Sequence, residues 1–376
     1  MIFSGVHHQR AQVHNEGCLT DSEAEVYTVI GRNSSAMLVG LQDDSYFMLW
    51  HKKFESLEYL LTSDISLYAI DSNYAYFVKI PKGIDNFNTE DHPFMFKAQQ
   101  DNAEEVIVIT VDKLLRLSKR LRKPSCSLTF LVHSTRCGST ALCQMFNALP
   151  GWRAIAETAF PVKYLYDMRY KHGKSVTDLA YCDKFYDVAE ACIRIYVKDF
   201  EPQLNVLFKT IGITEFFMIP FISKRFPESH IISAHRSGLG TAKSSYQVFY
   251  DMALNMVLPT IWNRHVSYNL FWGDVSRIIL LMSSVMGEEV ERHLMSGQYR
   301  DSFYLHYVRW ITNSLLYLKY YGDANPGKLT CVNFEDLMSD KQGTLSQVGY
   351  YLPMNVCITN KSHVESGFGG YWALKN

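Results

Sequence analysis

The residues best suited to chemistry form a cluster of a cation, a glycine and two hydroxyls directly after an apolar run. Leu128-Thr-Phe-Leu-Val132 is followed by Arg136, Gly138, Ser139 and Thr140. Backbone amides at a glycine turn and at the start of a helix attract anions, and an arginine adds positive charge. We therefore predict a buried strand, an anion-binding loop and a helix, in that order along the chain.

This loop differs from the phosphate-binding loop of nucleotide triphosphatases. That loop would need a glycine at position 133 and a lysine at position 139, where the chain has His133 and Ser139. The cation is instead Arg136, two residues before the glycine. A magnesium nucleotide would lack the lysine that usually binds its phosphates here.

A second cation follows another apolar run further along the chain. The run Ser229-His-Ile-Ile-Ser-Ala-His235 leads to Arg236, and Ser244 follows eight residues later. A phosphate monoester is doubly charged near neutral pH and calls for a forked donor together with a hydroxyl. Arg236 and Ser244 provide both, so we predict a second anion site at a strand-to-helix junction.

Taken together, the two segments resemble the donor-binding motifs of sulfotransferases. Arg136-Cys-Gly-Ser-Thr140 resembles the 5'-phosphosulfate loop, and Arg236 with Ser244 resembles the 3'-phosphate pair. The resemblance implies 3'-phosphoadenosine 5'-phosphosulfate (PAPS) as co-substrate, with no metal required. It also implies that the residues that bind PAPS are Arg136, Cys137, Gly138, Ser139, Thr140, Arg236 and Ser244.

Three weaker matches extend this resemblance over about the last two thirds of the chain. They are the runs 205–210, which includes Lys209, 329–337, which ends in Phe-Glu-Asp-Leu, and 366–372, which is rich in glycine. The chain also departs from the family pattern. Ser237 and Gly238 replace the usual Asp or Asn and Pro, and Ile211 stands where the cytosolic small-molecule branch has its catalytic histidine.

The catalytic residues that the resemblance implies are Arg136, Glu157 and Lys209. Arg136 would stabilise charge on the leaving phosphate, and Lys209 would point into the cleft. Glu157 follows a strand-like run and could accept a proton, or it could instead cap the next helix. His133 and His235 are alternative acids or bases, although a histidine at a strand end more often has a structural role.

Aromatic side chains downstream are compatible with an apolar acceptor pocket. For each one, however, packing in the core is the simpler interpretation. These residues are Phe160, Tyr164, Tyr166, Tyr246, Phe249, Tyr250 and Trp262.

Composition limits the classes of partner. The 376 residues carry a formal net charge of -1, so there is no global positive field for nucleic acid. The eight cysteines form no Cys-x-x-Cys pair and no zinc spacing. No signal-peptide core and no apolar run of membrane-spanning length occurs, so the sequence predicts a cytoplasmic protein with no membrane partner.

The spacing of apolar runs predicts two parts. Residues 1–120 should form a strand-rich module of unknown role, with strands near 25–30, 36–41, 46–51, 65–70, 74–80 and 105–111. Residues 121–376 should form an α/β domain, a parallel sheet flanked by helices, with strands near 128–133, 152–157, 204–209, 230–235 and 329–333. Helices are expected at 112–121, 214–226, after 237, at 301–321 and up to 352.

Three functions are compatible with the sequence. The first is a sulfotransferase that acts on a hydroxyl or amine of a small-molecule or glycan acceptor. The second is a P-loop nucleotide kinase or phosphotransferase, and the third is a catalytically silent nucleotide-binding scaffold. The sequence does not fix the acceptor or the oligomeric state.

Overall fold

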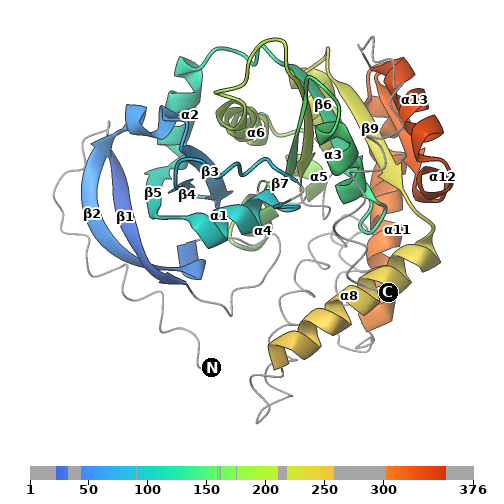
Figure 1. Cartoon of the computed structure of the whole chain (residues 1–376), viewed down its shortest axis with the longest axis horizontal. Coiled ribbons are helices and arrows are strands. Elements are labelled where there is room, and N and C mark those ends of the chain that lie inside the picture. The colour runs from blue at the N-terminus through green and yellow to red at the C-terminus, as the bar shows by residue number, and fades with distance from the viewer. Residues whose placement is uncertain are drawn as a thin grey trace.

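Two five-stranded sheets form the framework of the computed structural model (Figure 1). The structure describes residues 23–32, 44–89, 91–158, 160, 162–174, 176–210, 218–257 and 302–352. The predicted strand near 36–41, the glycine-rich run 366–372 and Ile211 lie outside these residues.

The first sheet is antiparallel, with the strand order β2-β1-β5-β4-β3. Its strands are β1 (Glu23–Arg32), β2 (Phe47–Ser56), β3 (Ile65–Ile70), β4 (Tyr74–Lys79) and β5 (Glu105–Thr110). Helices α1 (Met95–Asn102) and α2 (Val111–Arg120) precede and follow β5. The predicted strand-rich module is therefore confirmed.

The second sheet is parallel, with the strand order β10-β9-β6-β8-β7. Its strands are β6 (Ser127–His133), β7 (Trp152–Thr158), β8 (Asn205–Thr210), β9 (His230–His235) and β10 (Leu329–Asn333). All five were predicted within one residue at each end. Its helices are α3 (Ser139–Asn147), α4 (Val162–Tyr170), α5 (Val176–Leu179), α6 (Asp183–Tyr196), α7 (Met218–Arg225), α8 (Gly238–Val257), α11 (Ser302–Tyr320), α12 (Phe334–Ser339) and α13 (Lys341–Tyr351).

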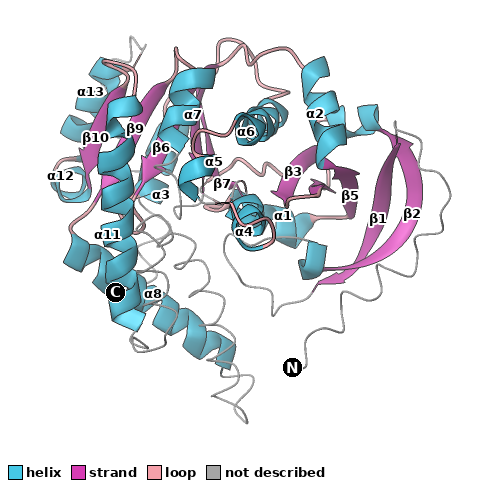
Figure 2. Ribbon diagram, turned by 180° about the vertical axis from the view of Figure 1, so that it is seen from behind, coloured by secondary structure: helices cyan, strands magenta, loops and turns pink. Residues whose placement is uncertain are grey.

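Helices cover both faces of the parallel sheet because its strands are apolar on both sides. Phe130 and Val132 of β6 pack in one cluster with residues of α6, α7 and α11. Leu131 faces the other way and packs with residues of α3 and α13. Figure 2 shows α6, α7 and α11 on the near side of this sheet. The predicted fold class, a parallel sheet flanked by helices with an added N-terminal module, is confirmed.

A single buried cluster joins the two sheets. It contains Ala24, Phe77 and Ile107 from the antiparallel sheet and Phe130 and Phe208 from the parallel sheet. Helix α6 lies between the sheets and contacts α2, β3 and α7 (Figures 1 and 2). The predicted domain boundary near residue 120 therefore separates two parts that share one apolar core. The division of the chain into two domains stays a prediction.

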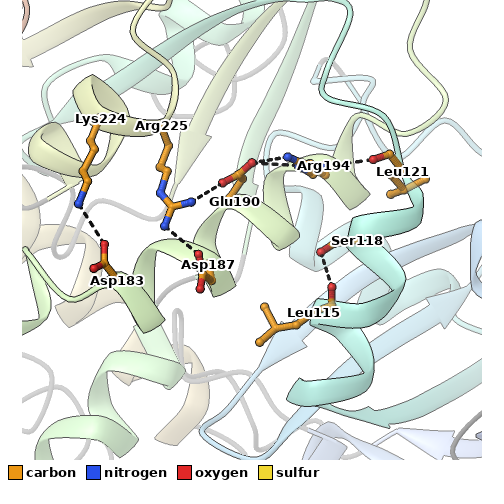
Figure 3. Close-up of polar contacts among 9 residues, drawn as sticks. All are labelled: Leu115, Ser118, Leu121, Asp183, Asp187, Glu190, Arg194, Lys224 and Arg225. Atoms are coloured by element: carbon orange, nitrogen blue, oxygen red, sulfur yellow. Dashed lines mark hydrogen bonds and ion pairs between the residues drawn. The ribbon is translucent and has the colours of Figure 1, made fainter.

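Charged side chains on the polar side of α6 attach it to its neighbours (Figure 3). Arg225 of α7 binds Asp187 and Glu190 of α6 at 2.7 and 3.1 Å. Arg194 of α6 pairs with Glu190 and donates at 3.2 Å to the carbonyl of Leu121, just after α2. These contacts fix α7, and with it the side of the parallel sheet that α7 covers, against the N-terminal module.

None of the helices within the described ranges is both long enough and apolar enough to cross a bilayer.

Candidate functional site

The loop between β6 and α3 contains two residues in the left-handed backbone region. Arg136 has a φ of 61° and Gly138, which caps α3, a φ of 81°. A Cβ at position 138 would lie 2.9 Å from Cδ2 of Phe334, so only glycine fits there. Left-handed residues next to a helix N-terminus are the backbone pattern in which successive amides can converge on an anion, as a phosphate-binding loop requires.

Some side chains of the loop between β6 and α3 are buried in the core, and others are exposed at the surface. The Arg136 side chain is exposed, whereas Cys137 is completely buried against α3 and Leu337. The predicted role of Cys137 in binding can therefore fall only to its backbone. Ser139 and Thr140 occupy the first turn of α3, where their hydroxyls and amides are closest to the loop.

The second cation lies where the sequence predicts it, between β9 and α8. The guanidinium of Arg236 stacks on the ring of Phe334, 4.1 Å from its centroid. Its Nη1 donates to the carbonyl of Arg136 at 3.1 Å. The carbonyl of Arg236 in turn accepts from Nε1 of Trp310 at 3.0 Å. The loop between β6 and α3 and the loop between β9 and α8 are therefore in direct contact.

Ser244 of α8 also contacts the loop between β6 and α3. Nε of Arg136 donates to Oγ of Ser244, in the second turn of α8, at 3.0 Å, although the two residues are 108 positions apart in the chain. Arg136, Arg236 and Ser244 thus form one connected group at the carboxyl ends of adjacent parallel strands. Open parallel sheets bind their ligands at this edge.

Buried polar atoms around this group have no partner within the described part of the chain. They are Nε of Arg236, Oγ of Ser134 and Oγ1 of Thr135. Buried polar groups are almost always hydrogen-bonded, so orphaned groups at one place require a ligand or water. An arginine with an unused donor, two hydroxyls and a glycine turn fit a phosphorylated anion.

A buried ion pair lies beside the loop. Lys209 of β8 is completely buried, and its Nζ donates to Oε1 of Glu157 at 2.6 Å and to Oγ1 of Thr140 at 3.1 Å. Glu157 of β7 sits at an irregularity in the pairing with β8, and its side chain is 14% exposed. Two of the three predicted catalytic side chains are therefore in contact, and Lys209 also contacts the first turn of α3.

Glu157 also has a left-handed backbone, with a φ of 56°. Among the residues that the structure describes, Arg136 and Glu157 are the only non-glycine residues with a positive φ. Such conformations cost about 1–3 kcal/mol each and concentrate at functional sites. Both outliers fall on residues that the sequence predicts to be catalytic, which supports this site over any other part of the described chain.

His235 is held neutral near physiological pH. Burial, followed by repulsion from nearby His133 whenever that imidazole is protonated, lowers the pKa of His235 to about 4. Its Nε2 lies 2.6 Å from Oγ of Ser233, and its ring packs against Tyr317. This environment favours a structural role over the alternative one as an acid.

Sequence reasoning missed the residues that support Arg236. Phe334 lies under the guanidinium, Trp310 binds the carbonyl, and Oε1 of Glu335 accepts from the amide of Ser237 at 3.4 Å. The Phe-Glu-Asp-Leu run was a signal for Phe334 and Glu335. No sequence signal marks Trp310, which lies inside a long helix.

The aromatic residues considered for an acceptor pocket are partly explained by the core. Phe160 and Tyr164 are completely or almost completely buried and belong to the cluster shared by the two sheets. Tyr246 is 37% exposed on α8. The side chains of Phe249, Tyr250 and Trp262 lie outside the described set.

Solved structures similar to this chain include six sulfotransferases, with TM-scores of 0.31–0.36 and identities of 10–14%. One is the sulfotransferase domain from the curacin biosynthetic pathway (13% identity, TM-score 0.36, 65% of this chain and 78% of that chain). Another is a mouse sulfotransferase complexed with PAP (12% identity, TM-score 0.35, 68% and 67%). A third is a sulfotransferase from Mycobacterium tuberculosis (10% identity, TM-score 0.34, 66% and 72%).

No protein-family model matches the chain, and a search of curated proteins gives no match. Because the TM-scores are below 0.5, these similarities assign no role to any residue.

Proposed function

We propose that this chain is a sulfotransferase that moves a sulfonate group from PAPS to a hydroxyl or amine acceptor. The observation that carries the proposal is the contact of Arg136 with both Ser244 and Arg236. It brings two anion-binding elements together from separate strand-to-helix junctions. PAPS has two separate phosphate groups on one ribose, so it requires two such elements side by side.

Each element has the donors that its phosphate would need. The loop amides, Arg136 and the hydroxyls of Ser139 and Thr140 would bind the 5'-phosphosulfate. Arg236, whose Nε is buried without a partner among the described residues, and Ser244 would bind the 3'-phosphate. The contact between Arg136 and Ser244 would then give way to contacts with the nucleotide.

The ion pair beside the loop suits in-line sulfonate transfer. The acceptor oxygen would form a bond to sulfur while the bond from sulfur to the phosphate oxygen breaks, and 3',5'-adenosine bisphosphate (PAP) leaves with that electron pair. Lys209 and Arg136 would stabilise the charge that develops on the leaving oxygen. Glu157 would take the proton of the acceptor hydroxyl.

A small-molecule or glycan acceptor and a cytoplasmic location belong to the same proposal. A metal is not needed in it, because Arg136, Arg236 and Lys209 supply the positive charge.

Thermal shift with PAP, with magnesium and ATP, and in buffer alone tests the proposal. The melting temperature should rise with PAP and stay at its buffer value with magnesium and ATP. Ser244→Ala should remove most of the rise with PAP. The matched control is Ser346→Ala, since the Ser346 hydroxyl donates to the carbonyl of Gln342 in its own helix. Stabilisation by magnesium and ATP instead would favour a phosphotransferase, and stabilisation by neither would favour a scaffold.

A further inference from the structure

The two hydroxyls at the start of α3 each have a nitrogen donor close to them. Oγ1 of Thr140 accepts from Nζ of Lys209 at 3.1 Å. Oγ of Ser139 lies 3.3 Å from Nδ1 of His133, the last residue of β6. His133 is 3% exposed and Ser139 is 6% exposed, so neither contact is open to bulk water.

The surroundings of His133 determine which of its nitrogens carries the proton. Nδ1 lies 3.1 Å from the carbonyl oxygen of Ser134. A carbonyl can only accept a hydrogen bond, so Nδ1 must be the protonated nitrogen. The same N–H then points between the Ser134 carbonyl and Oγ of Ser139, and Ser139 accepts from it.

Accepting from His133 has a consequence for the Ser139 hydroxyl. A hydroxyl has one hydrogen to donate and two lone pairs to accept with. With a lone pair of Oγ engaged by His133, the O–H of Ser139 is available for an acceptor in front of the loop. The ammonium of Lys209, which can only donate, has the same effect on Thr140.

We propose that His133 is a positioning residue for the anion loop: its Nδ1–H holds Oγ of Ser139 as an acceptor and so aims the Ser139 hydroxyl hydrogen at a bound phosphosulfate oxygen. This inference rests on the proposed function, because it takes PAPS as the anion. Phosphate and sulfate oxygens accept hydrogen bonds only, so a hydroxyl already turned toward them binds without reorientation. His133 acts through Ser139 and does not itself contact the ligand.

Isothermal titration with PAP provides a double-mutant test. Ser139→Ala should weaken PAP binding about tenfold, the range expected for losing one hydrogen bond to a charged group. His133→Ala should weaken it about fivefold. The variant with both changes should bind no more weakly than Ser139→Ala alone, because the two residues act through one hydroxyl. His133→Asn, which keeps a side-chain N–H, should stay within about twofold of the wild type.

A matched control separates positioning from general destabilisation. His230 is also 3% exposed, but it lies at the opposite end of β9, and its Nε2 bonds Oγ1 of Thr330. His230→Asn should lower the melting temperature while it leaves the affinity for PAP unchanged. A loss of PAP affinity in this control would mean that buried histidines affect the site only through stability, which would overturn the inference.

Nitrogen NMR on the ligand-free protein adds a readout that needs no ligand. The imidazole of His133 should show the Nδ1–H tautomer. The Nε2–H tautomer, or additive losses in the double variant, would overturn the inference and leave the proposed function standing. Failure of the wild type to bind PAP would instead overturn the proposed function, and this inference with it.

Discussion

Arg136 contacts both halves of the proposed anion site, with different atoms. Its Nε donates to Ser244, and its carbonyl oxygen accepts from Arg236. With its left-handed backbone, Arg136 directs its side chain toward Ser244 and its carbonyl toward Arg236. Because Arg136 has a strained backbone and makes both contacts, its substitution is a direct test of the site.

We expect Arg136→Ala to lower sulfonate transfer at least about 100-fold, the loss typical of removing one donor that stabilises charge in the transition state. Steady-state turnover with PAPS measures this. Arg122→Ala, at an exposed arginine outside the site, is the control and should retain full turnover. Turnover in Arg136→Ala equal to that of the wild type would rule out the assigned role.

Arg136→Gly separates backbone strain from side-chain chemistry. It should be as inactive as Arg136→Ala but about 1 kcal/mol more stable than that variant, since glycine adopts a positive φ without the steric cost. Urea denaturation of the two variants gives this difference.

Glu157 is tested by removing its charge while keeping its shape. Glu157→Gln should lower turnover by about 100-fold or more, because an amide cannot take the acceptor proton. Its amide oxygen still accepts from Lys209, so PAP affinity should remain near the wild-type value. Glu201→Gln, at an exposed carboxylate, is the matched control. A wild-type rate in Glu157→Gln would show that another group, or water, takes the proton.

At the scale of elements, the turn before α3 depends on glycine for two separate reasons. Gly138 has a positive φ and also lies against Phe334. Gly151 has a similar φ of 75°, but nothing lies within 4 Å of where its Cβ would be. The pair therefore allows conformational strain to be separated from steric overlap.

Gly151→Ala should reduce the free energy of unfolding by about 1 kcal/mol, from backbone strain alone. Gly138→Ala should cost clearly more, because the methyl group overlaps Phe334. Phe334→Ala in the same chain should recover part of the extra cost. Urea denaturation of these three variants and the wild type checks this. Equal costs at the two glycines would mean that the Phe334 ring moves aside without a cost in stability.

The elements that the sequence predicts best are those with a local signal. The strands of the parallel sheet are short apolar runs bounded by polar residues, so their positions follow from the pattern. Helix α6 was not predicted, and its position depends on packing between two sheets that no local pattern reveals. Of the predicted helix 214–226, the structure describes residues 218–226, and α7 (Met218–Arg225) lies there.

In the candidate site, too, the sequence predicts the residues with a local signal and misses the contacts that depend on packing. The sequence predicts Arg136, Arg236 and Ser244 because anion binding demands particular residue types after a strand. It does not predict that Arg136 itself contacts Ser244, since that contact depends on how neighbouring strands are ordered. The supporting role of Trp310 is a property of tertiary packing alone, as is the pairing of Lys209 with Glu157.

At the scale of the molecule, the two sheets share one apolar cluster, so the two parts should not be separable. A fragment of residues 121–376 would leave the apolar side of α6 without the partners that α2 and β3 contribute to the shared cluster. We expect it to lack the near-UV circular dichroism of the full chain and to bind a hydrophobic dye. A native-like spectrum and a cooperative melt for this fragment would show that the α/β part is independent.

Buried histidines should make stability depend on pH. Burial lowers the pKa of His230 and of His235 to about 4, from about 6.5 in the unfolded chain. Between these values the unfolded chain binds more protons, so the free energy of unfolding should fall as the pH drops from about 6.5 toward 4. Urea midpoints at pH 7.5, 6, 5 and 4.5 measure this decline.

A variant with His230→Asn and His235→Asn should show a flatter decline over the same interval. Carboxylates such as Asp167, whose pKa is lowered by Lys163 and Lys171 against the opposing effect of burial, lose their contribution only at lower pH. An unchanged slope in the double variant would assign the acid sensitivity to other groups.

The pairing of β10 beside β9 also determines when the anion site can form during synthesis. Phe334, which supports Arg236 and fills the space beside Gly138, directly follows β10 and emerges about 100 residues after β9. At about 5–20 residues per second, the ribosome needs roughly 5–20 s to cover that distance. A nascent chain that already has β6, α3 and β9 therefore still lacks the ring under Arg236, so the proposed nucleotide site stays incomplete until β10 and α12 have emerged.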